Sequence, residues 1–110
     1  MSLSTHVLDT MHGRPASGLA VVLSGANGEI GRGTTNADGR CPDLAPAGLA
    51  PGTYAIRFSV AAYFRGLGVD LADPPFLDEV TVHFGIAADG GHYHVPLLVS
   101  PYGYSTYRGS

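Results

Sequence analysis

Glycine and proline interrupt this chain so often that the apolar segments between them are short. The sequence holds 16 glycines and 8 prolines in 110 residues, and both residue types favour turns. Between the turns, apolar and polar residues tend to alternate, which is typical of β-strands with one buried face. In the segment 53–60, for example, Tyr54, Ile56 and Phe58 point one way and Arg57 the other. The pattern predicts a β-protein.

The positions of these segments predict seven or eight strands and one short helix. A strong hairpin signal stands at Asn27-Gly28, an irregular loop follows over 41–52, and only 61–67 is expected to be helical. An all-β antiparallel sandwich accommodates such strands, and 110 residues predict a single domain over 1–110. The expected strands are 3–10, 19–24, 29–35, 53–60, 79–86, 91–99 and 102–108.

Composition excludes several classes of function. A formal charge of −3 offers no basic surface for nucleic acid or for an anionic membrane. All six basic residues are arginines, which excludes lysine-dependent phosphate loops and Schiff-base chemistry. No apolar run approaches the roughly 20 residues of a membrane helix, and the first residues lack the pattern of a secretion signal. Together with the lone Cys41, this predicts a cytoplasmic protein.

Three histidines near the C-terminal third form the first candidate cluster. A turn at Asp89-Gly90 predicts that 79–86 and 91–99 pair as a hairpin, with alternate apolar residues facing the core. His83, His92 and His94 would then gather on the opposite face. This face is either solvated polar surface or, since His92 and His94 are two residues apart, a pair of metal ligands. No cysteine or carboxylate lies nearby in sequence to complete a tetrahedral set, so no metal is expected.

Two long segments resemble the signatures of the transthyretin family. Residues 6–16, HVLDTMHGRPA, resemble the first signature, and 93–105, YHVPLLVSPYGYS, resemble the second. The family usually has leucine where this chain has Val99. The resemblance covers essentially the whole chain. It implies a transthyretin-like antiparallel sandwich of eight strands with a short helix after the fifth, and a homotetramer with pockets in its central channel.

The family has two functional branches, and the residues of this chain favour one. The vertebrate branch carries thyroid hormones. The enzymatic branch hydrolyses 5-hydroxyisourate and keeps a histidine in the first signature, an arginine after an Asp-Gly turn, a histidine in the second signature and a Tyr-Arg-Gly-Ser terminus. This chain has His6, Arg40, His94 and the terminus at 107–110. The resemblance implies ring-opening hydrolysis in urate degradation; the alternative is a carrier of aromatic small molecules without catalysis.

The expected mechanism uses direct attack by water. Histidines titrate near neutral pH, so His6 and His94 are expected around the water, one as base and one as acid or orienting group. Which of them is the base stays open. Arg40 offers a planar, permanent positive charge to a substrate carbonyl or to the oxyanion. The scheme requires neither a metal nor an organic cofactor.

The C-terminal residues are expected to complete the site. Tyr107 and Arg108 are expected to bind substrate, and the hydroxyl or free carboxylate of Ser110 is expected to orient a histidine or the water. His83, His92 and Cys41 receive no role at this stage.

Overall fold

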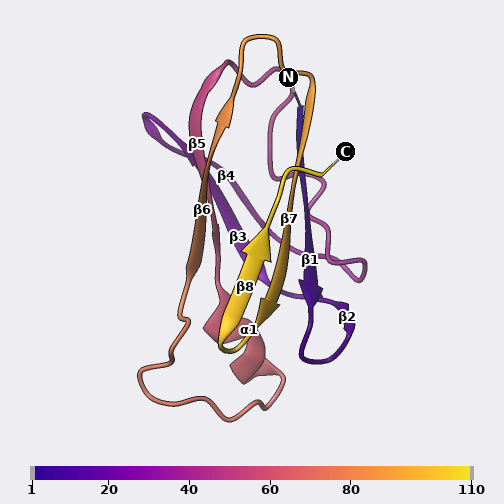
Figure 1. Ribbon diagram of the computed structural model, residues 1–110, viewed down its shortest axis with the longest axis vertical. Coiled ribbons are helices and arrows are strands. Elements are labelled where there is room, and N and C mark those ends of the chain that lie inside the picture. The colour runs from indigo at the N-terminus through magenta and orange to yellow at the C-terminus, as the bar shows by residue number, and fades with distance from the viewer. Residues whose placement is uncertain (1, 110) are drawn as a thin grey trace.

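The computed structural model describes residues 2–109, and in that range it has eight strands and one helix. The predicted eight-stranded sandwich with one short helix is confirmed (Figure 1). The elements are β1 (Ser2–Asp9), β2 (Arg14–Pro15), β3 (Ala20–Gly25), β4 (Gly28–Thr34), β5 (Gly52–Phe58), α1 (Val60–Gly66), β6 (Val80–Ile86), β7 (His92–Ser100) and β8 (Gly103–Thr106).

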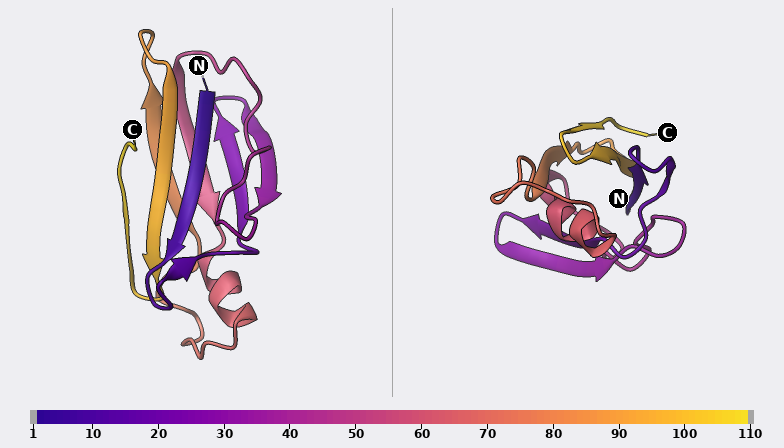
Figure 2. Two further views of the ribbon diagram at one scale, coloured as in Figure 1. Left: turned by 90° about the vertical axis from the view of Figure 1, so that its right-hand side faces the viewer. Right: turned by 90° about the horizontal axis from the view of Figure 1, so that it is seen from below.

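The strands form two four-stranded sheets that pack face to face. One sheet has the order β2-β1-β7-β8 and the other the order β4-β3-β5-β6, and Figure 2 shows β1 and β7 on one side of the molecule and β3 and β4 on the other. Strands β1 and β7 run parallel over their whole length, whereas the other paired strands are antiparallel. Parallel pairing requires a long connection, and the entire second sheet lies between β1 and β7 in the chain.

The core lies between the two sheets and is built by the predicted alternation. On β5, Tyr54, Ile56 and Phe58 are buried while Arg57 is exposed. The largest fully buried side chains come from both sheets and from α1, and apolar burial on this scale is the main stabilising contribution to such a fold. They include Phe58, Phe64, Leu19, Leu23, Ile56, Leu97, Val7, Val21, Val60 and Val99.

Two local boundaries differ from the sequence prediction by one residue. The hairpin between β3 and β4 turns at Ala26-Asn27, because Gly25 pairs with Gly28 and a bulge follows Leu23. Helix α1 begins at Val60, which was expected to be the last residue of the preceding strand. The Val60 side chain is buried in the core. Just beyond the helix, Gly68 has a φ of 82°, a conformation that favours glycine and ends helices.

The predicted hairpin between β6 and β7 is wrong. Strand β6 pairs with β5, and β7 pairs with β1 and β8, so the turn at Asp89-Gly90 connects the two sheets. The alternation within each strand is nevertheless as expected, with Val82 and Val95 buried and the histidines outside the core. His83 therefore lies on a different sheet from His92 and His94, and the predicted cluster of three histidines is not formed.

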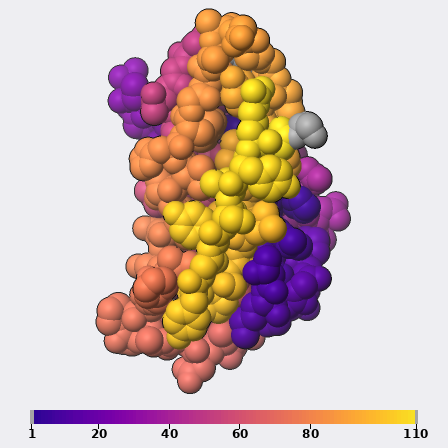
Figure 3. Space-filling view, in the orientation of Figure 1, coloured from indigo at the N-terminus to yellow at the C-terminus, as the bar shows by residue number. Residues whose placement is uncertain are grey.

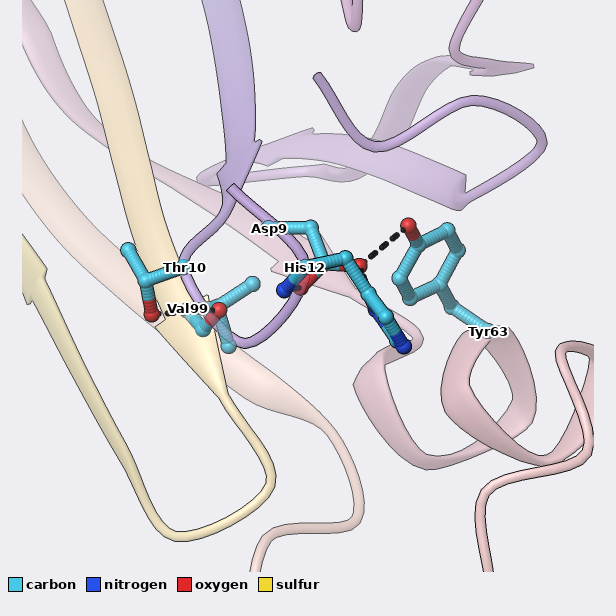
Figure 4. A network of polar contacts seen from close by, with 5 residues as sticks. All are labelled: Asp9, Thr10, His12, Tyr63 and Val99. Atoms are coloured by element: carbon cyan, nitrogen blue, oxygen red, sulfur yellow. Dashed lines mark hydrogen bonds and ion pairs between the residues drawn. The ribbon is translucent and has the colours of Figure 1, made fainter. Parts of the chain in front are cut away.

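A buried carboxylate closes the end of the sandwich near α1. Asp9, at the end of β1, is fully buried and accepts hydrogen bonds from the Tyr63 hydroxyl at 2.7 Å and the His12 backbone N–H at 3.0 Å. Its carboxylate also lies 2.6 Å from Nδ1 of His12 (Figure 4). Burial acts to raise the pKa of Asp9, but the hydrogen bonds outweigh it and the pKa is lowered. Burial and the bond to Asp9 raise the pKa of Tyr63 to about 12.

The first and the last described residues lie along the N-terminal part of β7, at the opposite end of the sandwich. Figure 1 shows the N-terminal part of β1 and the segment after β8 near the same end of β7, far from α1. In residues 2–109, no helix is long and apolar enough to cross a membrane.

Candidate active site

The parallel register of β1 and β7 brings His6 and His94 onto one face of the sheet. Ser4 lies opposite His94, and His6 lies opposite Pro96. Side chains two residues apart on a strand point the same way, so Ser4, His6 and His94 share the outer face. Both histidine side chains are partly exposed on this face. The fold thus unites residues from the two ends of the sequence.

Arg40 reaches the same face through an isolated bridge to β1. His6 and Arg40 form an antiparallel β-bridge, and the Val7 N–H donates to the Gly39 carbonyl at 2.8 Å. Paired residues share a face, so Arg40 lies beside His6 on the side away from β7. The sequence prediction that His6, Arg40 and His94 belong together agrees with this arrangement.

A tight turn holds Arg40 in position. The side-chain oxygen of Asn36 accepts hydrogen bonds from the N–H groups of Asp38 at 2.9 Å and Arg40 at 3.1 Å. Gly39 has a φ of 74°, and a Cβ there would collide with the Val7 carbonyl. Arg40 is exposed, and within residues 2–109 no carboxylate pairs with its guanidinium. The charge is therefore available to a ligand.

The surroundings of His94 favour its neutral form. Burial lowers the pKa of His94, and electrostatic interactions with Arg40, His6 and His92 lower it further, against a smaller opposing effect of Ser4. An imidazole that stays neutral at neutral pH can accept a proton, and its conjugate acid is a strong donor.

A hydrogen-bonded chain of side chains continues from His94 to the edge of the sheet. Nδ1 of His94 lies 2.7 Å from Oγ of Ser4, which also lies 2.8 Å from Nε2 of His92. Nδ1 of His92 lies 2.6 Å from Oγ of Ser2. Neither His92 nor Ser4 was expected in the site from the sequence. Alternation along 92–94 predicted that His92 shares a face with His94, but nothing local predicts a shared serine from β1.

The C-terminal segment lies directly against His94. The Gly109 N–H donates to the His94 carbonyl at 2.7 Å, and a Cβ at Gly109 would stand 2.5 Å from Cδ2 of the His94 ring. Figure 3 shows this segment, in yellow, crossing the surface of β7 between β1 and β6. Only glycine allows the backbone to approach the imidazole so closely. Ser110, predicted as a site residue, lies outside the described residues.

The other two predicted tail residues lie apart from this group. The Arg108 guanidinium stacks over the Tyr93 ring, 4.0 Å from its centroid. Tyr93 is buried and alternates with His94, so Arg108 occupies the opposite side of β7 from the imidazole. Tyr107 is 60% exposed. Both line a cleft of about 190 Å³ toward β6, together with His83.

The match to a family model decides the classification. The model described as "HIUase/Transthyretin family" matches residues 3–109. The chain belongs to this family. A protein of Rhizobium meliloti named "5-hydroxyisourate hydrolase 2" is 54% identical over 98% of this chain and 95% of its own length.

Solved structures from both branches of the HIUase/Transthyretin family have the same fold. The Klebsiella pneumoniae 5-hydroxyisourate hydrolase is 36% identical with a TM-score of 0.87, covering 100% of both chains. Sea bream transthyretin, solved with thyroxine, is 30% identical with a TM-score of 0.86, covering 99% of this chain and 95% of its own. An (S)-allantoin synthase is 39% identical with a TM-score of 0.91, but this chain, 99% covered, spans 43% of it.

Proposed function

We propose that this chain is an enzyme that hydrolyses 5-hydroxyisourate to 2-oxo-4-hydroxy-4-carboxy-5-ureidoimidazoline, a step of urate degradation. The observation that carries the proposal is the common face of His6, Arg40 and His94, joined by the β1–β7 register and the His6–Arg40 bridge. The relative from Rhizobium meliloti, at 54% identity, bears the name of this hydrolase. The carrier alternative is not favoured by these observations.

His94 serves as the group that takes a proton from the attacking water. Its pKa is lowered by burial and by electrostatic interactions with Arg40, His6 and His92, so it is neutral and ready to accept a proton at neutral pH. The same imidazole then returns a proton to the leaving ring nitrogen. His6, on the same face, orients the water or the substrate.

Arg40 binds the carbonyl that the water attacks. 5-Hydroxyisourate is a small planar bicycle rich in carbonyl and N–H groups, and its attacked carbonyl becomes an oxyanion in the tetrahedral intermediate. A planar guanidinium can donate two parallel hydrogen bonds to such oxygens and carries a permanent charge. Removing a donor of this kind commonly costs about 3–4 kcal/mol in the barrier.

The tail closes the site beside His94. Gly109 holds the backbone against the imidazole, and Ser110 is expected to place its hydroxyl near the reacting water. Tyr107 and Arg108 are proposed to contact substrate from a neighbouring position. For Arg108 this requires that the guanidinium leave the Tyr93 ring.

We further propose that the chain forms a homotetramer with its sites between subunits. His6, Arg40 and His94 lie on an open sheet face, and the hollow beside Ser4 and Arg40 measures only about 160 Å³. Catalysis on a planar substrate needs walls that exclude water, which a second copy of this face would supply. The reaction as written needs no metal or organic cofactor. The cytoplasmic location indicated by the lone Cys41 stays a prediction.

A coupled absorbance assay tests the proposed function. Urate oxidase generates 5-hydroxyisourate in place, and the decay of its near-ultraviolet band is followed with and without the protein. We expect decay that accelerates in proportion to protein concentration and continues through many turnovers. Stoichiometric binding without accelerated decay would instead indicate the carrier.

A further inference from the structure

We propose that Ser4 and His92 form a proton relay that connects Nδ1 of His94 to the surface at Ser2. The relay rests on the proposed hydrolase function and gives it a route for the proton. It consists of three successive contacts, His94 Nδ1 to Ser4 Oγ at 2.7 Å, Ser4 Oγ to His92 Nε2 at 2.8 Å, and His92 Nδ1 to Ser2 Oγ at 2.6 Å.

The donor and acceptor capacities of these groups allow two states in which all the hydrogen bonds of the chain run in one direction. In both, Ser4 donates its one proton to one histidine and accepts from the other, and each neutral imidazole uses its one N–H and its one lone pair. When His94 carries its proton on Nδ1, it donates to Ser4, Ser4 donates to Nε2 of His92, and His92 donates to Ser2. The second state reverses every bond. In the first state Nε2 of His94 is free to act as a base.

The relay lets His94 work as a base and then as an acid without holding a net charge. As water adds its oxygen to the carbonyl carbon, its proton binds to Nε2 of His94, and the Nδ1 proton passes through Ser4 and His92 to solvent at Ser2. As the ring C–N bond breaks, Nε2–H protonates the leaving nitrogen, and a proton returns to Nδ1 along the same chain. The new carboxylic acid then ionises into solvent, so atoms and charges balance.

The position of His94 explains why such a relay is useful. Arg40 and His6 lie on the same face, and their positive charges disfavour an imidazolium at His94. His92 is more exposed than His94, and Ser2 is exposed, so the chain leads from a partly buried group to water. A proton that moves along this chain while water attacks the carbonyl is carried away from the positive charge of Arg40.

Rescue by a small proton carrier tests the relay. Ser4→Ala interrupts the chain at its centre, and we expect kcat to fall about tenfold or more, up to the roughly 10²–10⁴-fold that general acid–base catalysis contributes. Added imidazole should restore much of this loss in Ser4→Ala while leaving the unaltered protein unchanged. Ser4→Thr, which keeps the hydroxyl, should retain most of the activity. Unchanged kcat in Ser4→Ala, or a loss that imidazole does not restore, would overturn the relay.

A matched pair of histidine variants separates the relay from a general effect of losing a histidine. His92→Phe should lower kcat and respond to imidazole as Ser4→Ala does. His83→Phe removes an exposed histidine from the other sheet and should do neither. Equal behaviour of the two variants would contradict the relay.

The tautomer of His94 gives a readout that does not depend on activity. In the ligand-free protein labelled with ¹⁵N-histidine, NMR should detect the His94 proton on Nδ1, and Ser4→Ala should shift the population toward Nε2–H. An Nε2–H tautomer in the unaltered protein would overturn the relay. Absence of hydrolysis by the unaltered protein would refute the proposed function instead, while the tautomer would still report on the hydrogen-bonded chain.

Discussion

Gly109 lies against the imidazole of His94, and its N–H donates to the His94 carbonyl at 2.7 Å. The contact links the end of the chain to the group proposed to move protons. A Cβ at Gly109 would stand 2.5 Å from Cδ2 and 3.1 Å from Cγ of the ring, closer than side-chain atoms pack. Even the methyl group of an alanine at position 109 would therefore displace the His94 ring or the backbone of the C-terminal segment.

Gly109→Ala is expected to reduce activity while preserving the fold. The added methyl must push the His94 ring or the tail aside, and a displacement on the order of 1 Å can cost about 10²-fold in rate. The matched control is Gly103→Ala, where the new Cβ would meet only Ser100 Oγ at 3.9 Å. Initial rates and thermal melting of both variants check the prediction. If Gly109→Ala were as fast as Gly103→Ala and the unaltered protein, the contact between Gly109 and His94 would be irrelevant to catalysis.

Arg40→Lys is expected to lower kcat by about 10²–10³-fold, as the loss of a donor to the oxyanion does. Lysine keeps the positive charge but lacks the planar pair of donors. The side chain is exposed, so the melting temperature should hardly change. Arg57→Lys, at an exposed arginine of β5, provides the control. Steady-state kinetics decide, and a fully active Arg40→Lys would remove Arg40 from the proposed mechanism.

The pH dependence of the reaction should follow His94. Its pKa is lowered from the ordinary 6.5 by burial and by Arg40, His6 and His92. Activity should therefore rise with pH as His94 loses its proton, with a midpoint below pH 6.5 and a plateau above it. Removing the Arg40 charge in Arg40→Gln should move the His94 pKa upward, because a positive neighbour disfavours imidazolium. An NMR titration of His94 measures both values. A midpoint above 6.5 in the unaltered protein would contradict this assignment.

Tyr63→Phe is expected to destabilise the fold without changing the chemistry. The variant removes the hydroxyl that donates to the buried Asp9 carboxylate at 2.7 Å, and hydrogen bonds to charged groups contribute roughly 1.5–3 kcal/mol. The ionised Asp9 carboxylate contributes to the free energy of unfolding above its ordinary pKa of 3.8, and this contribution is lost as the pH falls through the lowered pKa of the folded state. Urea unfolding at neutral pH measures the cost. A variant as stable as the unaltered protein would contradict it.

Local patterns predicted most of the fold but not the pairing of distant strands. Alternation located the buried residues of β5, because burial repeats every second residue in a strand. The helix expected at 61–67 lies one residue earlier, at Val60–Gly66. The β6–β7 hairpin was wrong because a turn signal does not reveal whether its strands share a sheet. Here β7 pairs with β1 from the opposite end of the chain.

The same limit explains what could be predicted of the site. His6, Arg40 and His94 were found through family motifs, which carry long-range information that a single sequence lacks. Ser4 was missed because its partner His92 is 88 residues away and only the parallel register unites them. Arg108 was expected to bind substrate with His6 and Arg40, but it stacks on Tyr93, because Gly109 pairs with His94 and the neighbouring residues face the other side of β7.

The central claim is that the face bearing His94 hydrolyses 5-hydroxyisourate, and one comparison of rates tests it most directly. Freshly generated substrate is mixed with equal amounts of the unaltered protein, His94→Asn or His83→Asn, and the decay of its near-ultraviolet band is recorded. We expect rapid decay with the unaltered protein and with His83→Asn, and decay near the spontaneous rate with folded His94→Asn. Undiminished decay with His94→Asn, or spontaneous decay with all three, would contradict it.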